Sequence, residues 1–330
     1  MKKMTVKRTA AFTLVMFMLL LAVSCESDSD KAANALPEMA YPLLSEKYFR
    51  SDGGQDSEEI FEYDAQGNLT HRQIRWSGEG TTDSVYQYEN GRLVRLTKKD
   101  EYDGVTTLRE YAYQYDANGL LKDISENENG EYAGKTSYLR DASGRIKRVI
   151  DYDSADSFIM MSEHKYDAAG HCVEEKKYSA KRIVSRYIYQ YDDSGHVAGC
   201  MVYDEKGAVL TYRLSYTEDG QLLRKEWLDE NRNCYRDETY SFDEKGRRAS
   251  RTDTKNGAIV QMTYYEAYDE NGNCVKESSY QWHDGAQDEK PAWYIERLYG
   301  GEKVPSPLWE CGDRIYHGDF LYSDVKRYAF

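Results

Sequence analysis

The chain has 330 residues and a formal net charge of −14, with 58 acidic and 44 basic residues. An acidic surface repels phosphate groups, so this balance excludes nucleic acid as a partner and favours cationic or neutral partners. The 31 tyrosines set a second limit. Their rings bury apolar area while their hydroxyls stay in water, so a thin β-sheet can be stable without a thick aliphatic core.

The first 25 residues predict export from the cytoplasm. A basic start, Lys2 to Arg8, precedes the apolar run 10–23. This is the pattern of a signal peptide, and the run is too short for a comfortable membrane span. The run ends in Leu-Ala-Val-Ser-Cys, which resembles a bacterial lipobox. The resemblance implies that residues 1–24 are a lipoprotein signal peptide and that Cys25 carries lipid. The alternative is an ordinary cleaved signal with a chance cysteine.

The expected location is therefore the bacterial cell envelope, with the membrane as a partner through the lipid on Cys25. Residues 25–45 are expected to form a flexible tether, because they begin with a polar, acidic run and contain Pro37 and Pro42. The acidic run resembles signals that send some lipoproteins to the outer surface. The outer membrane or the cell surface is thus the predicted site.

A strand-turn-strand motif recurs along the rest of the chain. In the stretch Tyr187 to Val197, tyrosines alternate as on one face of a strand, and Asp-Xaa-Xaa-Gly then supplies a turn. Asp at the first turn position accepts a bond from the N–H two residues on, and Gly at the fourth adopts positive φ at low cost. The predicted structural turn residues are Asp64, Gly67, Gly91, Asp116, Gly119, Asp141, Gly144, Asp167, Gly170, Asp192, Gly195, Gly220, Asp243, Gly246, Asp269 and Gly272.

The turn glycines recur every 24 to 28 residues, and a second turn signal lies about midway between them. Each repeat is therefore two strands and two turns, and nine repeats predict an all-β, antiparallel meander of about 18 short strands over residues 46–300. A flat sheet of this size would be about 85 Å wide, and open sheets rarely exceed ~10 strands without curling. We therefore expect an extended spiral or solenoid-like sheet. An open spiral and a closed tube both satisfy the pattern, which also leaves open which face is buried.

The motif Tyr63-Asp64-Ala65-Gln66-Gly67-Asn68-Leu69 resembles the YD (Rhs-type) repeat of bacterial surface and toxin-shell proteins. The resemblance covers about residues 58 to 285. It implies an extended, curling β-sheet, but it implies no activity, because such repeats occur in proteins with different roles.

Nothing in the sequence predicts an enzyme, a metal or a cofactor. No catalytic or phosphate-binding motif occurs, and the six His are scattered. The turn aspartates could bind calcium, but one carboxylate for each turn supplies too few oxygens. Cys172 and Cys274 stand two residues after a turn Gly, where other repeats carry Leu or Val, so we interpret them as core residues.

The tyrosine rows are the possible binding surface, with Tyr187, Tyr189 and Tyr191 as its example. Aromatic faces along a sheet can stack sugars or contact a protein. The alternative is that these rings pack against one another across strands. Residues 301–330 are expected to cap the array, with a pocket lined by Trp309, Tyr316 and Phe320 as the alternative.

The predicted function is that of a membrane-anchored, non-enzymatic lipoprotein that binds or scaffolds an unknown protein or glycan partner. Two other classes stay open. One is a shell or chaperone-like fragment related to polymorphic toxin systems, and the other is an envelope enzyme with a site that the sequence does not reveal.

Overall fold

The computed structural model describes residues 39–78, 80–179, 182–207, 209–301 and 304–305. The predicted signal peptide, Cys25 and most of the predicted tether lie outside these residues. So does nearly all of the predicted cap, including Trp309, Tyr316 and Phe320. The described part of the chain contains no helix that is long and apolar enough to cross a membrane.

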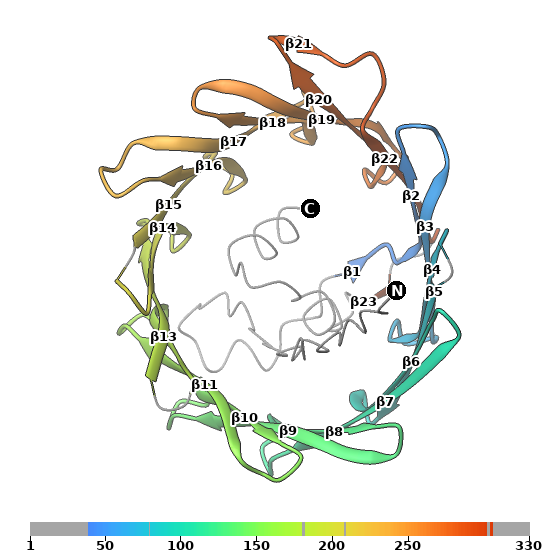
Figure 1. The fold of residues 1–330 in the computed structure, drawn as a ribbon, viewed down its shortest axis with the longest axis vertical. Helices are drawn as coiled ribbons and strands as arrows, with labels where there is room; N and C mark the ends of the chain where they lie inside the picture. Colours follow the sequence, from blue (N-terminus) through green and yellow to red (C-terminus); the bar gives the residue numbers. More distant parts are fainter. Residues whose placement is uncertain (1–38, 79, 180–181, 208, 302–303, 306–330) are drawn as a thin grey trace, which may run out of the picture.

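The described residues form β-strands joined by turns (Figure 1). The strands are β1 (Met39–Ala40), β2 (Leu43–Arg50), β3 (Gln55–Tyr63), β4 (Leu69–Trp76), β5 (Gly80–Glu89), β6 (Arg92–Tyr102), β7 (Val105–Tyr115), β8 (Leu121–Glu128), β9 (Glu131–Arg140), β10 (Ile146–Asp153), β11 (Phe158–Tyr166), β12 (Cys172–Ser179), β13 (Arg182–Tyr191), β14 (Val197–Asp204), β15 (Val209–Tyr216), β16 (Leu222–Leu228), β17 (Cys234–Phe242), β18 (Arg248–Lys255), β19 (Ala258–Tyr268), β20 (Cys274–His283), β21 (Ala286–Gln287), β22 (Trp293–Tyr299) and β23 (Val304–Pro305).

The sheet closes into a ring, so the expected extended spiral or solenoid-like sheet is wrong. Each strand from β2 to β20 pairs antiparallel with the next one along the chain. β22 then pairs with β20 on one side and with β2 on the other. Among the described residues, this gives a closed barrel of 20 antiparallel strands (Figure 1).

The two strands that close the ring flank the 18 strands joined by the nine predicted turns, and all of β22 and most of β2 lie within the predicted sheet domain 46–300. β22 follows the last repeat. β2 begins at Leu43, inside the range 25–45 that was expected to form a tether. Their pairing joins Leu43 to Tyr299 and Arg50 to Trp293, so every edge of the long sheet is satisfied. An open spiral would leave two exposed edges, and closure removes that liability.

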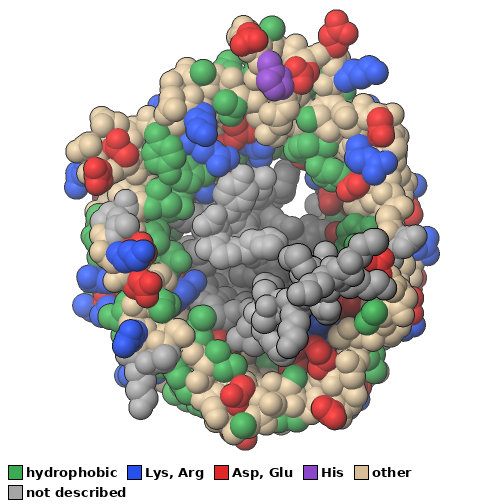
Figure 2. Space-filling view, in the orientation of Figure 1, with side chains coloured by type: hydrophobic (Ala, Val, Ile, Leu, Met, Phe, Trp, Pro, Cys, Tyr) green, Lys and Arg blue, Asp and Glu red, His purple; other side chains and the backbone are tan. Residues whose placement is uncertain are grey.

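The two faces of the ring differ in chemistry. Side chains alternate between the inside and the outside of a barrel along every strand. In β5, Thr82, Ser84 and Tyr86 are buried, whereas Val85 and Gln87, on the other face of the strand, are exposed. The concave face crowds its side chains, so the buried set is the inner one. Figure 2 shows hydrophobic side chains along the inner edge of the ring and many charged ones around its outer rim.

A ring of 20 strands is wide enough to enclose more than its own side chains. Barrels of about 8 strands are filled by side chains, whereas barrels of about 16 to 18 strands leave a channel. β1 and β23 pair antiparallel with each other, and in Figure 1 their ribbons fall within the outline of the ring.

Candidate functional site

The predicted turn residues lie at the hairpin turns of one rim of the ring. At the turn Asp192 to Gly195, the Gly195 N–H donates to the Asp192 carbonyl at 3.1 Å. The Asp192 Oδ1 accepts from the N–H groups of Ser194 at 2.9 Å and His196 at 2.8 Å. Gly195 has φ +85°, the left-handed conformation that favours glycine. Each carboxylate thus serves its own backbone.

At six of the turns, the tyrosine that ends the strand before the turn connects one repeat to the repeat before it. The Tyr191 hydroxyl, at the end of β13, donates to the carbonyl of Cys172, at the start of the neighbouring β12, at 2.8 Å. The same kind of bond runs from Tyr63 to Leu43, Tyr115 to Leu93, Tyr166 to Ile146, Tyr216 to Val197 and Tyr268 to Arg248. These bonds hold successive hairpins side by side.

The three tyrosines of the possible binding surface are on the inner face, where they pack. Tyr189 is buried, and its hydroxyl donates to Glu175 Oε2 at 3.3 Å. Its ring stacks with that of Tyr187 at a centroid distance of 6.4 Å. Lys177 Nζ lies 4.9 Å from the Tyr187 ring centre, a cation–π distance. Together with the hydrogen bond of the Tyr191 hydroxyl, these contacts show that all three side chains pack and bond within the inner wall.

An inner ladder of cross-strand pairs runs around the wall at one height. In each pair the first residue is on the strand before an Asp-Xaa-Xaa-Gly-type turn, and the second is on the strand after it. The pairs are Phe61–Arg72, Tyr86–Leu96, Tyr113–Ile124, Tyr138–Val149, His164–Glu175, Tyr189–Cys200, Leu214–Lys225, Tyr240–Arg251 and Tyr265–Glu277. Eight of the nine first residues are Tyr, Phe or Leu. His164 is the exception.

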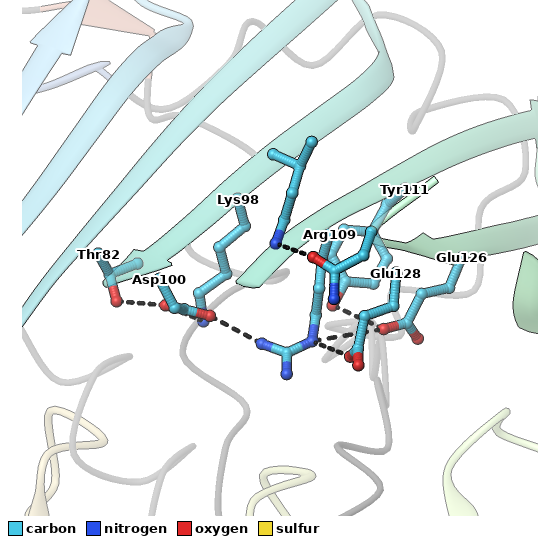
Figure 3. Close-up of polar contacts among 9 residues, drawn as sticks. Thr82, Lys98, Asp100, Arg109, Tyr111, Glu126 and Glu128 are labelled. Atoms are coloured by element: carbon cyan, nitrogen blue, oxygen red, sulfur yellow. Dashed lines mark hydrogen bonds and ion pairs between the residues drawn. The ribbon is translucent and has the colours of Figure 1, made fainter. Parts of the chain in front are cut away.

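Charged side chains form clusters on the inner face beside the ladder. Figure 3 shows one, in which Arg109 of β7 lies between acids of β6 and β8. Its Nη1 contacts Asp100 at 2.7 Å, and its Nε contacts Glu128 at 2.9 Å and Glu126 at 3.9 Å. Burial raises the pKa of Glu126, against the opposing effects of Tyr111 and Arg109.

A second charged cluster is at the seam where the ring closes. Arg297 of β22 contacts Glu46 of β2 at 2.6 Å and Glu277 of β20 at 3.0 Å. The Arg297 side chain is 14% exposed, so this ion-pair group connects three strands from a partly desolvated position. The inner wall therefore supports closure with charge pairing as well as with backbone bonds.

At β11 and β12 the inner wall carries buried polar atoms without partners. Here Ser162, His164 and Glu175, together called the polar gap, are 2%, 6% and 1% exposed. Within the described chain, Ser162 Oγ, both His164 ring nitrogens and Glu175 Oε1 have no hydrogen-bond partner. Lys177 Nζ stands 3.7 Å from Glu175 Oε1, an ion-pair distance beyond a hydrogen bond.

Burial controls the ionisation of the groups in and near the polar gap. It lowers the pKa of His164, although Glu175 opposes the shift, so the imidazole is neutral at pH 7. On β10, burial raises the pKa of Asp151 to about 6, although Thr136 donates a hydrogen bond to it. The wall around β9–β12 thus contains titratable groups in a poorly solvated setting.

The polar gap was not among the sequence-predicted sites, although the sequence carries a signal for it. The strand before the turn reads Tyr-Xaa-Tyr-Xaa-Tyr at Tyr187 to Tyr191, whereas the corresponding residues of the preceding repeat read Ser162-Glu163-His164-Lys165-Tyr166. The departure shows in the repeat, but its burial depends on which face points inward.

The described cysteines are free, and no disulfide joins them. Cys200 and Cys274 are buried in the inner wall, Cys172 is partly buried, and Cys234 is exposed. The described residues contain no group of three or more His, Cys, Asp or Glu side chains placed to hold a metal ion.

No family model and no curated protein matches the chain. Solved structures with a similar course of the chain include the crystal structure of TcdB2-TccC3-TEV, at TM-score 0.33 and 13% identity, covering 79% of this chain and 19% of that one. TcdB2-TccC3-Cdc42 matches at TM-score 0.26 and 10% identity, covering 83% and 19%. This chain thus spans about a fifth of the length of either.

A porin-like protein from Bacteroides uniformis also matches, at TM-score 0.23 and 13% identity, covering 78% of this chain and 97% of that one. At these TM-scores and identities, the similarities define neither a family nor a function for the chain.

Proposed function

We propose that the chain is a non-enzymatic binding scaffold of the bacterial cell envelope, a lipid-anchored ring of YD-type repeats whose working surface is its inner wall. The observation that carries this proposal is the closure of the 20 strands around an enclosed space. A closed ring offers a partner two distinct surfaces, and their chemistry differs.

The inner wall has the composition of a binding surface. Its ladder holds rigid aromatic side chains that are mostly buried by packing in the wall, and its clusters around Arg109 and Arg297 supply charges that are 31% and 14% exposed. Aromatic and charged groups held in place by neighbours bind a partner at a low cost in side-chain entropy. Because the wall surrounds the guest, one guest can contact several repeats at once.

The outer wall has the composition of a surface in water. Ion pairs join neighbouring strands there: Arg148–Glu163 at 2.7 Å, Arg186–Glu174 at 2.5 Å, Arg213–Glu226 at 2.5 Å and Arg224–Asp237 at 3.2 Å. A charged side chain that faces lipid at mid-membrane costs about 2–4 kcal/mol, and such barrels carry an outward apolar band. These pairs favour a ring that stands in water, attached to the membrane through Cys25.

Photocrosslinking in the native envelope tests whether the inner wall is the working surface. Tyr113 faces inward and is buried, whereas its neighbour Gln114 faces outward and is exposed. With p-benzoyl-phenylalanine at position 113, we expect adducts with a partner that are absent with the same probe at position 114. Adducts at 114 with none at 113 would place the working surface outside the ring.

The anchor is tested separately. Cys25→Ser in the full-length chain should move the protein from the membrane fraction to the soluble fraction, while acylation of Cys25 should appear as a mass shift of the wild-type N-terminal peptide. A Cys25→Ser protein whose leader is not cleaved would lack the lipid but could stay in the membrane fraction through the leader. The N-terminal sequence is therefore determined for both the wild type and the variant.

The enclosing geometry favours one alternative, a shell-like protein related to polymorphic toxin systems, in which the ring contains a polypeptide. The observation that supports it is the pairing of β1 with β23, whose ribbons fall within the outline of the ring in Figure 1. The crosslinked partner distinguishes the two functions, since a shell would contain one defined polypeptide and a scaffold would contact an envelope component.

A further inference from the structure

A row of directly opposed residues crosses β4 to β7 at the mouth of the ring, on the rim opposite the Asp-Xaa-Xaa-Gly turns. Trp76 ends β4 and is opposite Gly80, which begins β5. Gly80 is opposite Tyr102, and Tyr102 is opposite Val105. Directly opposite residues share one face of a sheet, and Gly80 shares its face with the buried Thr82. The row is therefore on the inner face.

Two aromatic rings of this row lie over Gly80 and remain exposed. A Cβ built on Gly80 would stand 3.1 Å from Tyr102 Cδ2 and 3.2 Å from Trp76 Cε3. Covering a glycine in this way stabilises a sheet and uses one side of each ring. The rest of each ring is open, since Trp76 is 45% exposed and Tyr102 is 65% exposed. These two side chains are called the aromatic platform.

Hydrogen-bonding groups lie beside the aromatic platform on the same face. Asp100 precedes Tyr102 by two residues of β6, so it lies about 7 Å deeper along the strand. Its Oδ2 contacts Arg109 Nη1 at 2.7 Å, and the two side chains are 27% and 31% exposed (Figure 3). A carboxylate has about four acceptor sites and a guanidinium has five N–H donors, so this pair retains capacity for a ligand.

An exposed aromatic face next to such groups matches the chemistry of a saccharide. A sugar ring has a C–H face that packs on an aromatic ring, and its hydroxyl groups both donate and accept hydrogen bonds. A stable protein interface buries about 1,200–2,000 Å², whereas two aromatic side chains supply at most about 500 Å². A protein partner is therefore disfavoured.

The charge of the neighbouring cluster favours a neutral saccharide. Figure 3 shows Asp100, Glu126 and Glu128 together with two cations, Lys98 and Arg109. The excess of carboxylates repels an anionic sugar or an anionic lipid headgroup. A neutral glycan meets the aromatic platform without this repulsion.

We propose that the aromatic platform and the Asp100–Arg109 pair form a binding site for a neutral glycan at the mouth of the ring. One sugar ring stacks on the platform, and its hydroxyl groups bond to Asp100 and Arg109. This inference rests on the proposed function, since it names the class of partner that the inner wall binds, and it locates the contact on β4 to β7.

Binding of neutral oligosaccharides tests the site. The full-length protein is purified in a detergent without a sugar headgroup and applied to an array of neutral hexasaccharides of different sugars and linkages. Titration of each hexasaccharide that binds gives its dissociation constant. Trp76→Ala and Tyr102→Ala should each weaken binding about three- to tenfold, the effect of losing one aromatic contact. Trp76→Phe and Tyr102→Phe keep a ring and should recover most of the affinity.

Gly80→Ala tests the geometry of the platform without removing a ring. Its added Cβ would displace both rings, so the affinity should fall, whereas Gly78→Ala adds a Cβ that meets nothing within 4 Å and should bind like the wild type. Phe158→Ala removes an exposed ring at another hairpin and should also leave binding unchanged. The thermal midpoint of every variant shows whether the ring is folded.

Photocrosslinking in the native envelope identifies the class of occupant. With p-benzoyl-phenylalanine at position 76, adducts that carry carbohydrate would support the site, and a protein adduct would overturn the glycan as its occupant.

The outcomes separate this inference from the proposed function. If no neutral hexasaccharide binds, or if the platform variants bind as tightly as the wild type, the glycan site is wrong. A partner crosslinked at position 113 would then leave the inner-wall function in place. Platform-dependent glycan binding with no adduct at 113 would support the site and restrict the working surface to the mouth of the ring.

Discussion

At the scale of single residues, the inner wall contains carboxylates that the ring holds at a cost. Asp151 is 5% exposed, and burial raises its pKa from 3.8 to about 6. Because the folded pKa is above the unfolded one, the folded state holds the proton more tightly. The favourable contribution is therefore complete below about pH 4 and is lost as the pH rises through 6.

Asp151→Asn should remove this pH dependence. At pH 8 the variant should have a higher free energy of unfolding than the wild type, by up to about 3 kcal/mol, and at pH 4 the two should be nearly equal. Asn keeps an oxygen that can accept from Thr136. Urea titrations at both pH values measure the difference, and equal stabilities at pH 8 would show that Asp151 is solvated.

The hydrogen bond from the Tyr191 hydroxyl to the Cys172 carbonyl leads to a second prediction. Tyr191→Phe deletes one hydroxyl and leaves a carbonyl without its donor, so the free energy of unfolding should fall by about 1 kcal/mol. Tyr102, which is 65% exposed, provides the matched control, and Tyr102→Phe should change nothing measurable. An equal loss of stability in both variants would show that the Tyr191 hydrogen bond does not stabilise the fold.

At the scale of the elements, the turns depend on the left-handed conformation of their glycines. Gly195→Ala forces a Cβ into φ +85° and places it 3.3 Å from His171 Nε2. We expect a loss of about 1–2 kcal/mol. Gly78→Ala is the control, since Gly78 lacks a positive φ and its added Cβ meets nothing within 4 Å. If the two substitutions were equally tolerated, turn strain would not set the repeat.

The sequence was most informative at this scale, because turn chemistry and alternation are local. The Asp-Xaa-Xaa-Gly spacing around Asp192 and Gly195 predicts a turn, and the structure places a turn there with the carboxylate bonded to its own backbone. The face of each strand could not be predicted. In β4, Leu69 and Ile74 are on opposite sides of a strict alternation, but a register shift between Glu62 and Tyr63 of β3 brings both to the same face, and a local pattern does not reveal that shift.

The same reason explains why the polar gap was missed. Ser162 and His164 depart from the tyrosine pattern, but a departure on an exposed face would have no consequence. Only when the buried face is known does the replacement of Tyr by His at position 164 imply that two ring nitrogens are buried without hydrogen-bond partners. Burial follows from closure, and closure involves strands about 250 residues apart, which a local pattern does not encode.

At the scale of the whole molecule, an antiparallel ring requires an even number of strands. Deleting residues 196–220 removes β14, β15 and two turns, which leaves an even number of strands. Deleting residues 196–207 removes β14 alone and reverses the direction of every later strand. The first variant should retain a cooperative thermal transition and a β-type circular dichroism spectrum, whereas the second should aggregate or unfold. Equal tolerance of both deletions would contradict the closed antiparallel ring.

A disulfide across the seam tests whether the ring is closed. Lys47 of β2 and Glu296 of β22 are directly opposite each other on the outer face. Neighbouring antiparallel residues have Cα atoms about 4.5–5.5 Å apart, within disulfide range. Cys234 is exposed, so the experiment uses a Cys234→Ser background. Under mild oxidation, Lys47→Cys with Glu296→Cys should form an intramolecular disulfide, and Lys47→Cys with Lys122→Cys should not. A seam pair that stays reduced would mean that the two ends of the sheet are apart and that the sheet is open.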